Sequence, residues 1–202
     1  MKKIAYSVLA GIILILGYQI FLSPAPRQTV GAVGETIICF GDSLTYGTGA
    51  GAGMDYPSQL SRLIDRPVIN AGVPGDTTAS ALERLERDVL AESPDVVLIT
   101  LGGNDLKNGV ARGMAFENLQ KIVESIQQRG ARVIIGGLKF PLRDRGYGKA
   151  YQKLADETGA SLIPNILEGI IGKRGLMSDS IHPNAQGYKI MAKRFREAML
   201  DY

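Results

Sequence analysis

Three side chains that together could carry out nucleophilic catalysis stand at distinctive positions in this sequence of 202 residues. Ser43 follows the short apolar run 36–40, and His182 is the only histidine in the chain. A serine hydroxyl needs a general base to become a nucleophile, and histidine is the side chain most often used for this. Asp179 stands three residues before His182, where it can fix the imidazole tautomer and stabilise the imidazolium. These residues predict a Ser–His–Asp triad capable of acyl transfer.

Ser43 also has a plainer interpretation. Serine and aspartate are favoured helix N-caps, so the pair Asp42-Ser43 after an apolar run is also typical of a helix start. The surroundings of the histidine favour the catalytic hypothesis, because the pattern D-x-x-H-P directly precedes an amphipathic segment. A lone histidine in that setting is less often a mere surface or core residue.

Acyl transfer further requires hydrogen-bond donors for the oxyanion that develops on the substrate. The candidate donors are the backbone N–H groups of Ser43 and Gly75 and the side-chain amide of Asn104. Glycine lets the backbone approach a substrate closely. An ordinary turn glycine at position 75 and a turn-forming asparagine at position 104 remain the alternatives.

The elements that must position these residues are predicted from hydrophobic periodicity. Continuous apolar runs predict buried parallel strands over 36–40, 67–71, 96–101, 132–136 and 160–163. Apolar residues at helical spacing predict helices over 78–92, 115–129, 148–158 and 184–200. This alternation predicts an α/β three-layer sandwich with a parallel sheet. The carboxyl ends of parallel strands share one edge, so we expect the polar clusters that follow the strands to converge there.

Four sequence blocks carry a resemblance to a known family. They are Gly41-Asp42-Ser43-Leu44, Gly75, Gly102-Gly103-Asn104-Asp105 and Asp179 to His182. In this order they resemble the GDSL or SGNH hydrolases over residues 36–200, most closely the lysophospholipase/thioesterase/arylesterase branch. The resemblance implies a flavodoxin-like five-stranded fold and a triad of Ser43, Asp179 and His182. It also implies an oxyanion hole formed by Ser43, Gly75 and Asn104.

Residues beside these blocks are candidates for contact with the substrate. The candidates are Asp42, Leu44, Asp105, Leu106 and Lys107. The family often places a substrate loop after the asparagine block, and here that segment is partly cationic, although a solvated loop is the alternative. The glycine-rich run 47–53 suggests a mobile rim near the nucleophile.

The N-terminal region has the pattern of a targeting segment. Lys2 and Lys3 precede residues 4–22, which carry no charge and roughly match the ~30 Å hydrocarbon core as a helix. We expect either an uncleaved membrane anchor or a signal peptide removed in the mature protein. Both place the rest of the chain outside the cytoplasm, periplasmic or at the cell surface. A Pro/Gly linker over 23–35 would then lead to a hydrolase domain over 36–202.

Composition excludes several other classes. The three basic residues before Glu35 account for the formal net charge of +3, so nothing calls for a nucleic-acid partner. The single cysteine, Cys39, excludes an intramolecular disulfide and is expected to be buried. One cysteine and one histidine nearly exclude a Cys/His zinc site, and no phosphate-binding glycine motif occurs. We expect no metal, no cofactor and a monomer.

Three functions remain as hypotheses. The first is hydrolysis of carboxylic esters or thioesters, with aryl esters, short-chain acyl esters and lysophospholipids as candidate substrates. The second is O-deacetylation of carbohydrate or cell-envelope material at the same site. The third is a non-catalytic envelope binding module, which a complete triad disfavours.

Overall fold

The computed structural model describes residues 36–139 and 145–200. The predicted anchor over 1–22 and linker over 23–35 lie outside this part of the chain. The strands are β1 Ile37–Gly41, β2 Ile69–Gly72, β3 Val96–Thr100, β4 Arg132–Gly136 and β5 Ser161–Ile163. The helices are α2 Ser43–Tyr46, α3 Tyr56–Ile64, α4 Thr78–Asp88, α5 Gly103–Asn108, α6 Arg112–Gln128, α7 Tyr147–Thr158 and α8 Ala185–Leu200, with 3₁₀ turns at Leu90–Glu92 and Arg174–Leu176.

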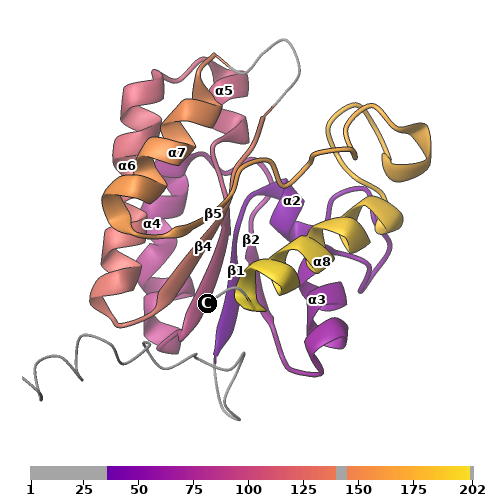
Figure 1. Cartoon of the computed structure of the whole chain (residues 1–202), viewed down its shortest axis with the longest axis horizontal. Helices are drawn as coiled ribbons and strands as arrows, with labels where there is room; N and C mark the ends of the chain where they lie inside the picture. Colours follow the sequence, from indigo (N-terminus) through magenta and orange to yellow (C-terminus); the bar gives the residue numbers. More distant parts are fainter. Residues whose placement is uncertain (1–35, 140–144, 201–202) are drawn as a thin grey trace, which may run out of the picture. The chain divides into compact units, whose positions relative to one another are not determined.

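The strands form one parallel sheet in the order β2-β1-β3-β4-β5 (Figure 1). This confirms the predicted five-stranded flavodoxin-like sheet, and each predicted strand lies within two residues of an observed one. Every residue of β1 and β3 is buried, as expected of central strands covered on both faces. Cys39 lies in β1 and is fully buried, which confirms its predicted place in the core.

Helices cover the two faces of the sheet in separate groups. Figure 1 shows α4, α6 and α7 on one face and α3 and α8 on the other. Helix α8 buries one stripe against the sheet, and its buried aromatic and methionine residues are Tyr188, Met191, Phe195 and Met199. Burying such large side chains contributes about 1.5–3 kcal/mol each, so α8 adds strongly to the stability of this layer.

Two helices were not predicted, α3 and α5. Helix α3 has a recognisable start, because the Asp55 carboxylate accepts a hydrogen bond from the Ser58 backbone N–H at 2.8 Å and Pro57 lies in the first turn. Helix α5 is only six residues long and lies between glycines at positions 102 and 109, so it has no apolar periodicity to detect. The predicted helix 78–92 ends at Asp88, beyond which the chain forms a 3₁₀ turn.

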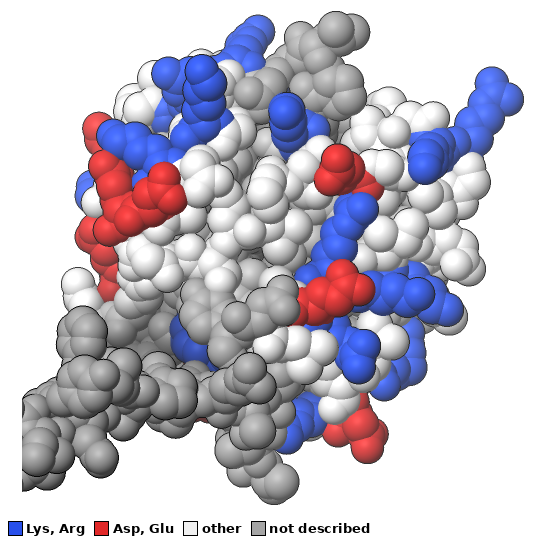
Figure 2. Space-filling view, viewed as in Figure 1, with Lys and Arg blue, Asp and Glu red and all other residues white. Residues whose placement is uncertain are grey.

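None of the helices in the described ranges combines the length and the apolarity that a membrane span requires. Acidic and basic side chains are both present on the face shown in Figure 2.

Candidate active site

Ser43 is the first residue of α2, directly after β1. The Asp42 carboxylate caps this short helix by accepting a hydrogen bond from the Leu44 backbone N–H at 2.9 Å. Helix α2 packs closely on the end of β2, where a Cβ atom on Gly72 would overlap the backbone nitrogen of Tyr46. Glycine at position 72 therefore allows the helix that carries Ser43 to lie directly on the edge of the sheet.

His182 is held in a tight turn before α8. The Asp179 carboxylate Oδ1 accepts backbone hydrogen bonds from Ile181 at 2.8 Å and from His182 at 2.7 Å. The turn is closed by a hydrogen bond from the Ser178 N–H to the His182 carbonyl at 2.9 Å. These bonds fix the backbone of the turn and with it the direction of the imidazole.

The structure brings Ser43, His182 and Asp179 into one hydrogen-bonded chain. His182 Nδ1 lies 2.7 Å from Asp179 Oδ2, and His182 Nε2 lies 3.0 Å from Ser43 Oγ. An ionised carboxylate only accepts hydrogen bonds, so Nδ1–H donates to Asp179 and Nε2 of the neutral ring is left to accept from the serine hydroxyl. The hydrogen bond from His182, together with those from the backbone, lowers the pKa of Asp179 to about 2.

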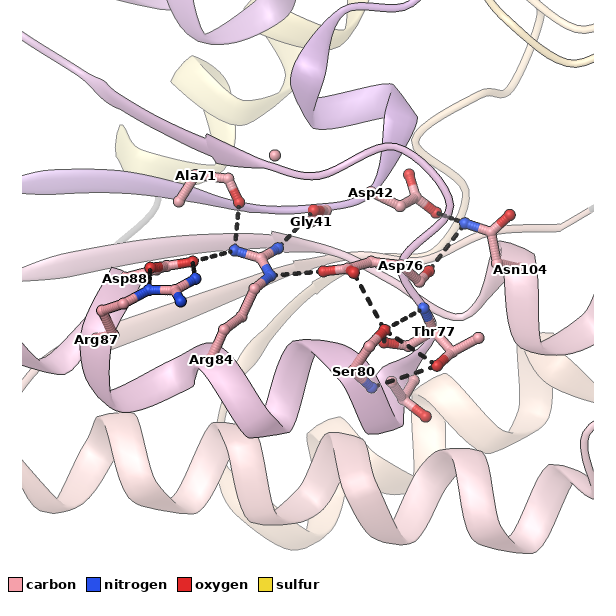
Figure 3. Close-up of polar contacts among 12 residues, drawn as sticks. Gly41, Asp42, Ala71, Asp76, Thr77, Ser80, Arg84, Arg87, Asp88 and Asn104 are labelled. Carbon is pink, nitrogen blue, oxygen red and sulfur yellow. Dashed lines mark hydrogen bonds and ion pairs between the residues drawn. The ribbon is translucent and has the colours of Figure 1, made fainter.

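Asn104 enters the site from the start of α5, directly after β3. Its side-chain Nδ2 donates to the Asp76 carbonyl at 2.8 Å and to Asp42 Oδ2 at 3.2 Å (Figure 3). Burial raises the pKa of the Asp42 carboxyl to about 7, against the lowering effect of the Leu44 N–H. Since β1 and β3 are neighbours at the point where the strand order reverses, Ser43 and Asn104 both follow strands that flank the topological switch point of the sheet.

The backbone N–H groups of Ser43 and Gly75 are the other two predicted oxyanion donors. Among the described residues, none accepts a hydrogen bond from the N–H of Ser43 or of Gly75. Gly75 has φ +89°, and a Cβ atom placed on it would meet no atom within 4 Å. Gly75 thus faces open space in a left-handed backbone conformation that favours glycine.

Three of the five predicted substrate-contact residues have buried side chains, and substrate contact itself stays a prediction. Asp42, Leu44 and Asp105 are all buried. Asp105 accepts hydrogen bonds from Thr78 at both carboxylate oxygens, from the backbone N–H at 2.9 Å and the hydroxyl at 2.7 Å, so it ties α5 to the start of α4. Leu106 is half-buried and Lys107 is exposed, so these two residues remain candidates.

The glycine-rich run 47–53 and the residue that follows it are hydrogen-bonded to the rest of the fold, while the mobility of this rim stays a prediction. The Thr48 carbonyl accepts a hydrogen bond from the Tyr188 hydroxyl at 2.8 Å, and the Met54 carbonyl accepts one from Gln59 at 2.6 Å. Gly49 packs so closely on Ser178 that a Cβ atom would lie 2.7 Å from the serine Cβ. The run therefore supports the turn that carries His182.

Sequence reasoning missed Arg84 and Asp76, which lie behind the site and form a buried ion pair at 2.6 Å. The sequence does indicate that Arg84 is buried, because Arg84 follows Ala81 by three residues on the buried face of α4.

Within residues 36–139 and 145–200, no three His, Cys, Asp or Glu side chains are grouped so that they could hold a metal ion.

Residues 39–190 match the GDSL-like Lipase/Acylhydrolase family. The chain belongs to this family. It is 31% identical over 163 residues to the Esterase TesA of Pseudomonas aeruginosa, covering 75% of this chain and 81% of that protein. It is 30% identical over 169 residues to the Thioesterase 1/protease 1/lysophospholipase L1 of Escherichia coli K12, covering 80% and 81%.

A solved structure agrees with the assignment to the GDSL family. The crystal structure of TesA matches with a TM-score of 0.77 at 29% identity, covering 82% of this chain and 98% of that one. As a member of the GDSL family with such relatives, this protein is a hydrolase of the esterase type.

Proposed function

We propose that this GDSL hydrolase cleaves carboxylic esters or thioesters through an acyl-enzyme formed on Ser43. The observation that carries the proposal is the hydrogen-bonded chain from Ser43 Oγ through the His182 ring to Asp179. A serine, a base and an orienting carboxylate within hydrogen-bond reach of one another form the arrangement that nucleophilic acyl transfer needs.

The first half-reaction forms the acyl-enzyme. Ser43 Oγ attacks the acyl carbonyl carbon while its proton passes to His182 Nε2, and Asp179 stabilises the imidazolium. When the tetrahedral intermediate collapses, the bond to the leaving oxygen or sulfur breaks and His182 gives its proton to that atom. In the second half, water attacks the acyl-enzyme with His182 as base, which releases the carboxylic acid and Ser43.

The oxyanion would be stabilised by the backbone N–H groups of Ser43 and Gly75 and by the Asn104 amide. Both amide hydrogens of Asn104 already have acceptors, at 2.8 Å on Asp76 and 3.2 Å on Asp42. The longer bond to Asp42 is the one that can be shared with an oxyanion, because the shorter bond holds the amide in place.

Exposed apolar side chains beside the site favour an acyl or aryl group as the part of the substrate that is bound. Tyr46 ends the helix that Ser43 begins, Val73 lies two residues before Gly75, and Ile181 precedes His182. These three side chains are 58%, 39% and 41% exposed. The exposed cation Lys107 lies in the same short helix as Asn104, and relatives are named esterase, thioesterase and lysophospholipase. We therefore propose aryl esters, short-chain acyl esters and lysophospholipids as the leading candidate substrates.

We also propose that the protein works outside the cytoplasm, held by residues 4–22 or released after their cleavage. The uncharged run behind Lys2 and Lys3 is the basis for this part of the proposal. The test is fractionation of cells that express the full chain, followed by mass spectrometry of its N-terminus. A cytoplasmic protein would contradict it.

A fluorophosphonate probe tests the nucleophile directly. We expect the wild-type protein to be labelled and Ser43→Ala to be unlabelled. Ser180→Ala is the matched control, since Ser180 is an exposed serine in the turn before His182, and it should be labelled like wild type. Labelling of Ser43→Ala, or none in wild type, would overturn the assignment.

Substrate class is tested by comparing hydrolysis rates on four kinds of compound. These are a chain-length series of p-nitrophenyl esters, lysophosphatidylcholine, an acyl-thioester and an acetylated xylo-oligosaccharide. Hydrolysis of the first three groups above the acetylated sugar supports the proposal. A preference for the acetylated sugar would instead support an O-deacetylase.

A further inference from the structure

A buried arginine lies directly behind the proposed oxyanion hole. The side chain of Arg84, in the middle of α4, is only 8% exposed. Its Nε donates to Asp76 Oδ2 at 2.6 Å, its Nη1 to the Ala71 carbonyl at 3.0 Å, and its Nη2 to the Gly41 carbonyl at 3.0 Å (Figure 3). Each nitrogen of the guanidinium is thus hydrogen-bonded, in a fork that only arginine can offer.

The acceptors of Arg84 belong to the backbone segments that lead into the site. Gly41 ends β1 and is followed directly by Asp42 and Ser43, while Ala71 lies in the neighbouring strand β2. The Gly41 carbonyl also accepts a hydrogen bond from the Val73 N–H at 2.9 Å. One guanidinium therefore connects the backbone before the nucleophile with the loop that carries Gly75.

Asp76 transmits this connection to Asn104. The Asp76 carboxylate is held at one oxygen by Arg84 and at the other by the Ser80 hydroxyl at 3.1 Å. With its side chain fixed at both oxygens, Asp76 presents its backbone carbonyl to Asn104 Nδ2 at 2.8 Å. Asp76 also follows Gly75 directly, so the same residue adjoins two of the three proposed oxyanion donors.

The remaining contacts of Arg84 lock its own position. Asp88 accepts from Nη1 at 3.0 Å, and the guanidinium carbon lies 4.4 Å from the centre of the Phe40 ring. A buried ion pair often adds little net stability compared with apolar residues of the same size. An ion pair that also holds two strand ends and the loop around Gly75 is better explained by the geometry it imposes.

We propose that Arg84 is a positioning residue for the oxyanion hole, acting through Asp76 on the Asn104 amide and on the Gly75 backbone. Arg84 does not touch the substrate. It keeps the donors preorganised, and preorganised donors stabilise the transition state without reorganisation during the reaction. This inference rests on the proposed esterase function.

The test uses Arg84→Lys and Asp76→Asn in the full chain, with Arg87→Lys as the matched control. Lysine keeps the charge but cannot bind the same acceptors together, and asparagine keeps a hydrogen-bonding side chain without the charge. Arg87 is the control because it is 77% exposed and contacts the same Asp88 from outside. Fluorophosphonate titration counts the functional sites in each preparation, so loss of folded protein does not lower the turnover per site.

Two quantities are compared, the kinetics on p-nitrophenyl acetate and the inhibition constant of a trifluoromethyl ketone. Such a ketone adds Ser43 Oγ to its carbonyl carbon, the proton passes to His182, and the carbonyl oxygen becomes an oxyanion. We expect kcat per titrated site to fall about 10- to 100-fold in Arg84→Lys and Asp76→Asn with KM within threefold of wild type. The inhibition constant should rise by a similar factor, and Arg87→Lys should match wild type.

Several results would overturn the positioning role. These are a kcat per site within twofold of wild type in both variants, a change confined to KM, or a fall in kcat without a rise in the inhibition constant. If Arg84→Lys yields no titratable sites, the same criteria applied to Asp76→Asn decide. Failure of the proposed function is a separate result, because wild type itself would then neither be labelled nor hydrolyse the ester.

Discussion

Asp179 holds His182 at two points with its two carboxylate oxygens. Oδ2 accepts from the ring Nδ1 at 2.7 Å, and Oδ1 accepts from the backbone N–H of the same histidine at 2.7 Å. One side chain thus sets both the tautomer of the imidazole and the conformation of the turn that carries it. These two roles can be separated by substitution.

Asp179→Asn should keep the turn and lose the activity. The asparagine Oδ1 can still accept the backbone N–H groups of Ile181 and His182, but its amide NH₂ would face Nδ1 as a donor. The ring would then place its proton on Nε2, which could no longer accept the proton of Ser43. We expect kcat to fall on the order of 10⁴-fold, while circular dichroism stays unchanged. A kcat within tenfold of wild type would contradict this role of Asp179.

The buried carboxyl of Asp42 should make stability depend on pH. Its pKa in the folded protein is about 7 against an ordinary value of 3.8, so the folded state favours the protonated form. The stabilisation that protonated Asp42 gives the folded state is fully present below about pH 4 and is lost as the pH rises to about 7. Above that pH the stability no longer depends on this carboxyl's titration.

The Asp42 effect is measured as the difference in unfolding free energy between wild type and Asp42→Asn, from urea titrations between pH 4.5 and 8. Asparagine can still cap α2 but does not titrate. The unfolding free energy of wild type minus that of Asp42→Asn should therefore fall with rising pH, by at most about 1.4 kcal/mol per pH unit. A difference that does not vary with pH would show that this carboxyl does not titrate in that range.

Cys39 should react with thiol reagents only in the unfolded protein. It is fully buried in β1, and burial raises the pKa of its thiol well above the ordinary value. We expect no reaction with Ellman's reagent under native conditions and one equivalent in denaturant. Native labelling faster than global unfolding would reveal local opening of β1.

Tyr188→Phe should weaken the attachment of the glycine-rich run 47–53. The variant loses the 2.8 Å hydrogen bond from the Tyr188 hydroxyl to the Thr48 carbonyl and leaves that carbonyl without this donor. We expect a loss of about 1–2 kcal/mol in the free energy of unfolding. Tyr46→Phe is the control, because Tyr46 is 58% exposed, and it should change stability by less than about 0.5 kcal/mol. Equal effects of the two substitutions would argue against the attachment.

Much of the fold could be predicted because its signals are local. The central strands β1 and β3 are continuous, mostly apolar runs, and α8 repeats its apolar residues at helical spacing. Helix α5 could not be predicted in the same way, since six residues between two glycines show no period. The pairing of Asp179 with His182 could also be predicted from the sequence, because Asp179 stands three positions before His182 within one turn.

The sequence by itself thus determined the elements, the edge of the sheet where polar residues collect and the candidates for chemistry. Only the tertiary structure decided which of these candidates meet. Ser43 and His182 stand 139 positions apart in the sequence. Ser43 Oγ nevertheless lies 3.0 Å from His182 Nε2, because β1 and the turn before α8 end at the same edge of the sheet. It also turned Asp105 inward and buried Arg84, since the orientation of a polar side chain depends on partners from distant segments. Local sequence carries propensity and periodicity, whereas contacts between distant segments arise only when the layers pack.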